Sequence, residues 1–142
     1  MPDPHTTRVS VVMPAYNEAA HIYGNIAITL GVMKDAGFDC EIVAVDDGSS
    51  DGSTQAILDL KAQDEKVIPV IFARNFCHQI GVTAGLDYSR GESVIIIDAD
   101  LQDPPEVILD LIEKWKDGYE LVYAVRSKRE GETWFKLFTA AA

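Results

Sequence analysis

The chain has 142 residues, 47% of them hydrophobic, which suffices for one globular core and is too short to expect two. Its formal net charge of -11 argues against nucleic acid as a partner, because such binding rests largely on Lys and Arg neutralising phosphates. Cys40 and Cys77 form no metal-binding pattern, and no apolar run approaches the ~20 residues of a membrane span, so we expect a soluble domain in a reducing, cytoplasmic setting.

Apolar runs and helical periodicities alternate along the chain. After residues 1–7, which we expect to be a disordered tail, the pattern predicts strands and helices in turn. The expected strands span residues 9–13, 41–45, 67–72, 93–97 and 121–125, and the expected helices 22–33, 54–62, 78–88 and 105–116. Near-continuous apolar strands that alternate with helices favour a mostly parallel sheet covered on both faces. The predicted fold class is therefore α/β, a three-layer α/β/α domain of Rossmann-like type.

Polar clusters follow the predicted strands. In chain order they read PAYNE, DDGSSD, ARN, DADLQD and VRSKR. Ligands of parallel α/β sheets bind at the carboxyl ends of the strands. We therefore expect these clusters to share one site.

The DADLQD cluster predicts a metal site. Asp98 and Asp100 leave an apolar strand, where unpaired carboxylates need a compensating cation or donor groups, and Gln102 adds a neutral oxygen. Mg²⁺ or Mn²⁺ prefers such oxygen ligands and keeps positions for substrate phosphates. The alternative is a helix N-cap, which explains Asp103 but needs only one side chain.

The DDGSSDGS cluster is typical of a nucleotide-binding loop. Asp46 and Asp47 follow a strand, where an acidic residue commonly hydrogen-bonds a ribose or base in α/β folds. An ordinary Asx turn explains the serines but leaves the doubled Asp less well explained. Neither GxGxxG nor a P-loop occurs, so a dinucleotide fingerprint is not indicated.

Two further clusters are less specific by themselves. In PAYNE, helix initiation accounts for Asn17 as an N-cap and Glu18 in the first turn. After the third strand, Arg74 is suited to an anion, whereas His78 and Cys77 are more often structural. The placement of both clusters at strand ends makes them candidates for the same site.

The segment VRSKREGETWFKLF is the basic part of an acidic chain. Arg126, Arg129 and Lys136 could bind a phosphate. The aromatic residues that follow would, on a helix, form a face suited to a membrane interface. The alternative is a solvated loop and a helix that faces the core.

Together these motifs resemble family 2 glycosyltransferases with the GT-A fold. The matching stretches are VSVVMPAYNEA, VAVDDGSSDGST, ARNFCHQIGVTAGLDYSRG, VIIIDADLQDPPEVI and VRSKREGETWFK, from Arg8 onward. DADLQDPPE is similar to the polyprenyl-phosphate subgroup, which includes dolichol-phosphate mannose synthase and bactoprenol glucosyltransferases. Cys77 stands where a glycine is usual after NF.

The resemblance implies a role for each matching position. The donor nucleotide would be held by Pro14, Tyr16, Glu18 and Asp47, with Asp46 beside them and Arg74 near. Asp98, Asp100 and Gln102 would hold the metal on the donor diphosphate. Arg126 would face the acceptor phosphate and, with Asp98 and Asp100, act in catalysis. Arg129 and Lys136 would be further acceptor cations.

The implied function is inverting transfer of a hexose from a nucleotide sugar to a polyprenyl phosphate. UDP-glucose is the expected donor and GDP-mannose its main competitor. Residues 8–125 would form the catalytic domain, and 126–142 the start of an acceptor and membrane-interface segment that we expect to continue in the natural protein. The expected place is the cytoplasmic side of the cell-envelope membrane, and homo-oligomer formation stays open.

Two other functions remain open at this point. The fragment could bind a nucleotide sugar without turnover. A phosphatase of the haloacid dehalogenase type also places DxD after an apolar strand and uses the first Asp as nucleophile. In that case the doubled-Asp loop at Asp46 and Asp47 would have no role.

Overall fold

The computed structural model describes residues 8–100, 104–129 and 132–140, and the side chains up to Val125 among these. The chain forms two compact units, residues 1–102 and 103–142. The predicted tail over residues 1–7, the predicted metal ligand Gln102 and the candidate cap Asp103 lie outside the described residues. The functional boundary expected after Val125 is untested and stays a prediction.

The first unit alternates strands and helices as expected. Its elements are β1 (Arg8–Ala15), α1 (Ile22–Asp35), β2 (Asp39–Asp46), α2 (Ser53–Gln63), β3 (Val67–Ile71), α3 (His78–Tyr88) and β4 (Ser93–Ile96). All strand pairs are parallel, in the order β3-β2-β1-β4. The carboxyl ends of the four strands therefore lie at one edge of the sheet.

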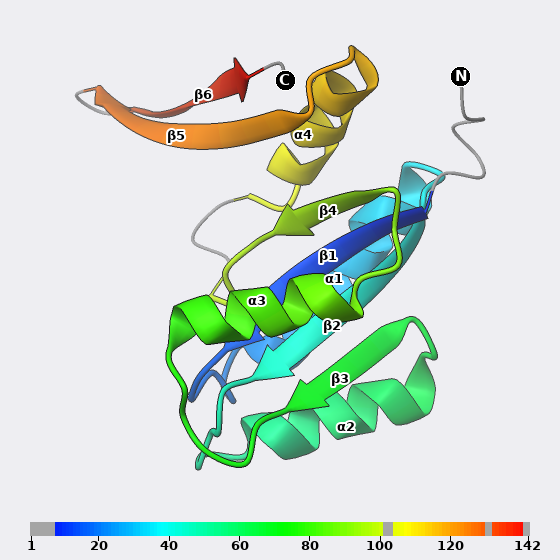
Figure 1. Ribbon diagram of the computed structural model, residues 1–142, viewed down its shortest axis with the longest axis vertical. Coiled ribbons are helices and arrows are strands. Elements are labelled where there is room, and N and C mark those ends of the chain that lie inside the picture. Colours follow the sequence, from blue (N-terminus) through cyan, green and yellow to red (C-terminus); the bar gives the residue numbers. More distant parts are fainter. Residues whose placement is uncertain (1–7, 101–103, 130–131, 141–142) are drawn as a thin grey trace. The chain divides into compact units, whose positions relative to one another are not determined.

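Helices cover the two faces of this sheet. Figure 1 shows α3 in front of the sheet and α1 behind it. The approach of α3 to β1 is so close that a Cβ on Gly85 would lie 2.2 Å from Val12 Cγ1. On this face, buried Val12, Val43 and Val45 pack together. The layered α/β/α architecture is confirmed.

Strand β4 is less buried than its apolar sequence indicates. Ile95 is 8% exposed, but Val94 and Ile96 are 38% and 47% exposed. β4 is the edge strand of its sheet, and α3 contacts β1 and β2. Two of the four β4 residues are therefore exposed at this edge of the four-stranded sheet.

The second unit contains α4 (Val107–Lys116), β5 (Leu121–Arg129) and β6 (Glu132–Ala140). β5 and β6 pair antiparallel, so β5 does not continue the parallel series as expected. The helix considered for the Trp134 segment is also wrong, because the aromatic and β-branched residues of ETWFKLFTA favour a strand. Among the described residues, none of the helices combines the length and apolar content that crossing a bilayer requires.

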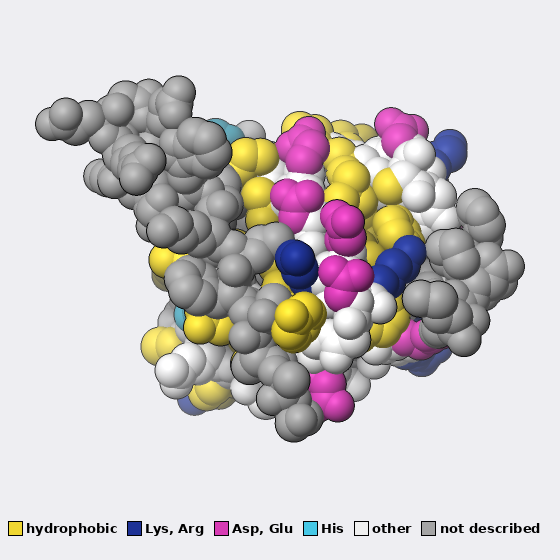
Figure 2. All heavy atoms as spheres, turned by 90° about the horizontal axis from the view of Figure 1, so that it is seen from above, with side chains coloured by type: hydrophobic (Ala, Val, Ile, Leu, Met, Phe, Trp, Pro, Cys, Tyr) yellow, Lys and Arg dark blue, Asp and Glu magenta, His cyan; other side chains and the backbone are white. Residues whose placement is uncertain are grey.

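The acidic balance of the chain is visible on its surface. Figure 2 shows a face on which Asp and Glu side chains gather among fewer Lys and Arg side chains. Such a surface repels polyanions at moderate ionic strength.

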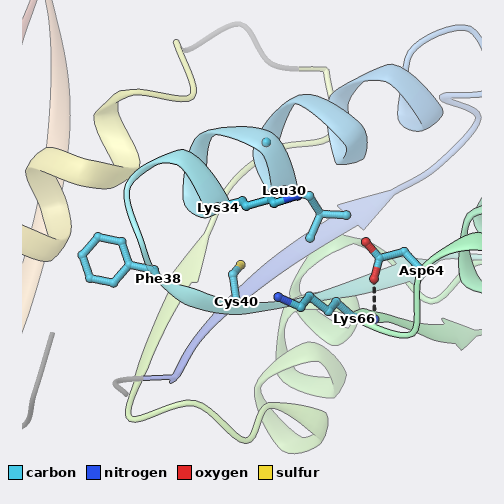
Figure 3. Close-up of a pocket in the computed structure, with 7 residues that line it drawn as sticks. Leu30, Lys34, Phe38, Cys40, Asp64 and Lys66 are labelled. Atoms are coloured by element: carbon cyan, nitrogen blue, oxygen red, sulfur yellow. Dashed lines mark hydrogen bonds between the residues drawn. The ribbon is translucent and has the colours of Figure 1, made fainter. Parts of the chain in front are cut away.

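A cavity of about 260 Å³ lies near the amino ends of β2 and β3. Cys40 lines it together with Lys34 and Lys66 (Figure 3), and burial raises the pKa of the Cys40 thiol to about 12. Lys66 Nζ lies 3.8 Å from Asp39 Oδ1, so its charge is already paired. The cavity is remote from the strand ends that carry the predicted site residues.

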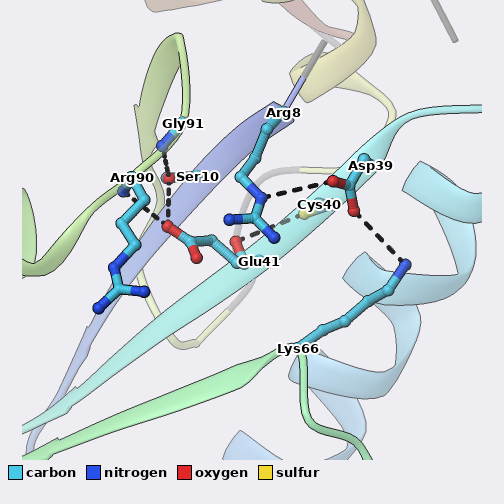
Figure 4. Close-up of polar contacts among 8 residues, drawn as sticks. All are labelled: Arg8, Ser10, Asp39, Cys40, Glu41, Lys66, Arg90 and Gly91. Carbon is cyan, nitrogen blue, oxygen red and sulfur yellow. Dashed lines mark hydrogen bonds and ion pairs between the residues drawn. The ribbon is translucent and has the colours of Figure 1, made fainter. Parts of the chain in front are cut away.

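A buried carboxylate ties the loop before β4 to the sheet. Glu41, 5% exposed, accepts hydrogen bonds from the Ser10 hydroxyl and the Arg90 N–H, both at 2.7 Å. The Ser10 Oγ in turn accepts from the Gly91 N–H at 2.7 Å (Figure 4). The Glu41 side chain of β2 therefore connects this strand to β1 and to the loop before β4.

Replacing Glu41 by Ala is expected to lower the free energy of unfolding by about 2–4 kcal/mol, because the buried Ser10 hydroxyl and the partly buried Arg90 N–H lose their acceptor. Denaturation in urea measures the change. The exposed Glu65→Ala is the control, and Glu41→Gln, which keeps one acceptor oxygen, should lose less. A Glu41→Ala protein as stable as the control would contradict the role of the network.

Candidate functional site

A cavity of about 190 Å³ opens at the carboxyl ends of β1 and β2. The tips of these strands, the loop between β3 and α3 and the first turn of α3 form its walls. The lining residues are Pro14, Ala15, Tyr16, Asp47, Asn75, Cys77, His78 and Gly81. Pro14, Tyr16 and Asp47, three of the predicted donor-binding residues, therefore meet in one cavity.

The loop after β1 is hydrogen-bonded to the loop after β2, and we call this set of bonds the clasp. The Asn17 N–H donates to Ser49 Oγ, and the Ser50 N–H donates to Asn17 Oδ1, both at 2.9 Å. The Glu18 N–H donates to Ser53 Oγ at 2.9 Å. These bonds hold the two clusters PAYNE and DDGSSD side by side.

Asn17 takes part in this clasp and does not form the helix N-cap that the sequence suggested. α1 begins at Ile22, four residues after Glu18, and α2 begins at Ser53 without a side-chain cap. Asp51 Oδ2 accepts from the Ala19 N–H at 3.0 Å. The Ser53 hydroxyl is the largest cause of the lowered pKa of Asp51, so this carboxylate stays ionised in the clasp.

Asp46 holds its own loop. The side chain is fully buried, Oδ1 accepts from the Ser49 N–H at 3.0 Å, and Oδ2 accepts from the Thr54 hydroxyl. Both oxygens thus fix the turn and the start of α2. A direct contact of Asp46 with a donor stays a prediction.

Asp47 fixes the loop after β3. It is 4% exposed; Oδ1 accepts from the Phe76 N–H at 2.7 Å, and Oδ2 accepts from Asn75 Nδ2 at 3.1 Å. Gly48, with φ 71°, permits the approach, because a Cβ there would lie 2.3 Å from the Arg74 carbonyl carbon. Asn75, which belongs to the ARN cluster but was given no role of its own, is therefore both a wall of the cavity and a partner of Asp47.

Arg74 and Glu18 lie beside the cavity but do not line it. The Arg74 guanidinium carbon is 4.0 Å from the centre of the Phe76 ring, a cation–π contact. The Arg74 side chain remains exposed and can reach an anion at the surface. The donor roles of both residues stay predictions.

Asp98 and Asp100 lie two and four residues after the end of β4, and both are exposed. Ala99 between them is 3% exposed, and its carbonyl accepts a hydrogen bond from Asn25 Nδ2 of α1. Asn25 thus anchors the turn that presents the two carboxylates. The sequence signal that could have identified Asn25 is its polar side chain beside Ile26, on the side of α1 that carries the buried residues.

The two carboxylates fit a divalent cation that shares its coordination with a substrate. Within the described residues there is no group of three or more His, Cys, Asp or Glu side chains that would form a complete protein site. Mg²⁺ is commonly held by one or two carboxylates together with substrate phosphates and water. Asp98 and Asp100 meet that requirement.

If the turn serves the function expected from the motifs, replacing Asn25 by Ala should weaken metal-dependent nucleotide-sugar binding about tenfold and lower stability by about 1 kcal/mol, because the Asp98–Asp100 turn loses its anchor. Calorimetric titration and urea denaturation measure the two effects. The control is Thr29→Val on the same helix, where the hydroxyl bonds the Asn25 carbonyl at 2.8 Å. Equal affinities of both variants would refute the positioning role.

The predicted acceptor cations lie in the second unit. The register places Arg126 opposite Phe135 and Lys136 opposite Val125, on adjacent rungs of the ladder, with Arg129 three residues from Arg126. Their side chains lie outside the described part of the structure. Their role toward an acceptor stays a prediction.

The parallel sheet, the loop-lined cavity and the carboxylates at the strand ends define an α/β domain of the GT-A type. The family model for glycosyl transferase family 2 matches residues 10–139, and the chain belongs to this family. An uncharacterized glycosyltransferase of Bacillus subtilis (strain 168) is 50% identical, over 93% of this chain and 41% of its own length. A prophage bactoprenol glucosyl transferase homolog of Escherichia coli (strain K12) is 40% identical, over 94% of this chain and 44% of its own length.

Solved structures confirm the fold. The mannosyltransferase of Pyrobaculum calidifontis in complex with GDP-Man and Mn²⁺ superposes with a TM-score of 0.67 at 26% identity, over 86% of this chain and 36% of its own. The family and the GT-A fold expected from the motifs are thus confirmed, and the bactoprenol relative supports the subgroup. The chain spans less than half the length of the curated relatives described here.

Proposed function

We propose that this chain is the donor-binding part of an inverting glycosyltransferase that moves a hexose from a nucleotide sugar to a polyprenyl phosphate. The observation that carries the proposal is the convergence of the cavity at the tips of β1 and β2 with Asp98 and Asp100 after β4. β4 pairs with β1, so the carboxylates and the cavity lie on neighbouring strand ends.

The names of the relatives support a choice of substrates for this proposal. One is named for glucosyl transfer to bactoprenol, and the structural neighbour was solved with GDP-Man and Mn²⁺. We propose UDP-glucose as the donor, with GDP-mannose as its main competitor, and polyprenyl phosphate as the acceptor. The proposed place of action is the cytoplasmic surface of the membrane.

In this proposal Tyr16 and Pro14 pack against the donor base, and Asp47 and Asn75 keep the loop after β3 in place. Asp98 and Asp100, with Gln102, would hold Mg²⁺ or Mn²⁺ on the diphosphate. When bound, the cation supplies Lewis-acid stabilisation of the leaving nucleoside diphosphate. Asn25 keeps the Asp98–Asp100 turn in position through the Ala99 carbonyl.

The acceptor side needs cations more than a base. A phosphate monoester is already anionic at neutral pH, so it can attack the anomeric carbon without a general base, and in-line attack inverts the configuration. Arg126, Arg129 and Lys136 would orient the phosphate. Arg126 would be the main contact, because it matches the arginine that faces the acceptor phosphate in the family that the motifs resemble.

Calorimetric titration with UDP-glucose and GDP-mannose, each with Mn²⁺ and then with a chelator, tests the donor site. Binding of one donor that disappears with the chelator would support the proposal. Release of phosphate from a phosphomonoester without any donor binding would favour the phosphatase instead. Donor binding without transfer to a polyprenyl phosphate would leave a nucleotide-sugar-binding fragment.

A further inference from the structure

Cys77 has a backbone conformation that is nearly restricted to glycine. Its φ is 76° and its ψ is 161°. Asn17 also has a positive φ, of 53°, but Asn adopts the left-handed helical region readily and Cys does not adopt the region of Cys77. A strained residue of this kind persists when its surroundings impose the conformation, and such residues cluster at ligand sites.

The neighbours of Cys77 impose the conformation. On one side, Phe76 and Asn75 are bonded to the Asp47 carboxylate at 2.7 and 3.1 Å. On the other side, the Cys77 carbonyl accepts from the Gly81 N–H at 3.2 Å in the first turn of α3. The direction of the Cys77 side chain is therefore set by bonds that do not involve its thiol.

The thiol is not needed to fill the core. Cys77 is exposed and lines the 190 Å³ cavity beside Tyr16 and His78. Its Sγ has a contact of 3.8 Å with Asn75 Oδ1, which is long for a hydrogen bond even to sulfur. The side chain thus occupies room at the cavity wall.

The topology indicates which part of a donor would meet this wall. The diphosphate must lie toward Asp98 and Asp100 at the tip of β4, the strand beyond β1. The loop that carries Cys77 follows β3, on the other side of β1 and β2. The nucleoside base therefore points toward the Cys77 side of the cavity.

We propose that Cys77 is a specificity-determining residue, whose CH₂SH group narrows the cavity so that it favours a pyrimidine over a purine base. This inference rests on the proposed function, because it assumes that the cavity takes the donor nucleoside. The shape of a pocket can discriminate between two ligands only to a limited extent, and one methylene changes selectivity by roughly 10–200-fold. Removing two heavy atoms is therefore expected to change selectivity by at least about tenfold.

The first test compares Cys77→Gly with Cys77→Ala. With Mn²⁺, the ratio of the Kd for GDP-mannose to the Kd for UDP-glucose is expected to fall about tenfold in Cys77→Gly and less in Cys77→Ala, which keeps the Cβ. The melting temperature should rise by about 2–5 °C in Cys77→Gly, where glycine relieves the strain, and stay nearly unchanged in Cys77→Ala. The two variants thus separate the effect of the backbone from that of the side chain.

The second test uses the unchanged protein. Burial and the raised pKa keep Cys40 unreactive at neutral pH, so the rate of alkylation by iodoacetamide reports on Cys77. UDP-glucose with Mn²⁺ is expected to slow this rate at least about fivefold at a saturating concentration.

The outcomes distinguish the two proposals. Failure of the unchanged protein to bind either donor would overturn the proposed function and this inference with it. Metal-dependent UDP-glucose binding that neither protects Cys77 nor changes its selectivity in Cys77→Gly would overturn the inference alone. A preference of the unchanged protein for GDP-mannose would also overturn it.

Discussion

Asp100→Asn is expected to weaken metal-dependent nucleotide-sugar binding by about 100-fold or more while changing the free energy of unfolding by less than about 0.5 kcal/mol. Asp100 is exposed at the tip of β4, so its exchange removes charge from the site without opening the core. A neutral amide binds Mg²⁺ or Mn²⁺ far more weakly than a carboxylate does.

Titration calorimetry with UDP-glucose at saturating Mn²⁺ measures the loss, and urea denaturation measures the stability. Asp87→Asn makes the same exchange at an exposed position of α3, and it should change neither quantity. Affinity of Asp100→Asn equal to that of this control would refute the metal role of Asp98 and Asp100.

Asp47→Ala is expected to lower both stability and donor affinity. The Phe76 N–H loses its acceptor in a nearly buried position, and the Asn75 amide keeps only the Asp47 carbonyl at 3.2 Å, which together should cost about 2–4 kcal/mol. The loop that forms one wall of the cavity then loses its anchor, so donor affinity should fall by more than about tenfold.

Urea denaturation and titration with UDP-glucose, performed on the same preparation, measure the two effects. Asp59→Ala is the control, because Asp59 bonds Gln55 Nε2 at 2.7 Å on the exposed side of α2. Reduced stability with unchanged donor affinity would show that the cavity is not the donor site, even though Asp47 supports the fold.

The pattern of apolar residues alone predicted the helices and strands that surround the site. The helix expected over residues 78–88 is found at His78–Tyr88, and the four strands of the sheet were each placed within two residues at either end. These elements follow from hydrophobic periodicity, which is local in sequence. The convergence of PAYNE and DDGSSD follows from the rule that parallel strands end at one edge.

The loops were less predictable. Asn17 was expected to cap a helix, but its side chain accepts from the Ser50 N–H of the other loop, and Ser53 Oγ accepts from the Glu18 N–H, both across more than 30 residues of sequence. The cap and the clasp use the same oxygen atoms, so local preference could not distinguish them. The bond between Asn25 and the Ala99 carbonyl spans 74 residues and left no local signal beyond a polar residue in a buried stripe.

The sequence by itself thus determined the α/β class, the strand ends that carry the site and the residue types available there. Only the tertiary structure decided that Asp46 and Asp47 hold loops, that Cys77 adopts a glycine conformation and that β5 pairs antiparallel with β6. The physical reason is that periodicity is a property of neighbouring residues. Hydrogen bonds between loops and the pairing of strands depend on which distant segments the folded chain brings together.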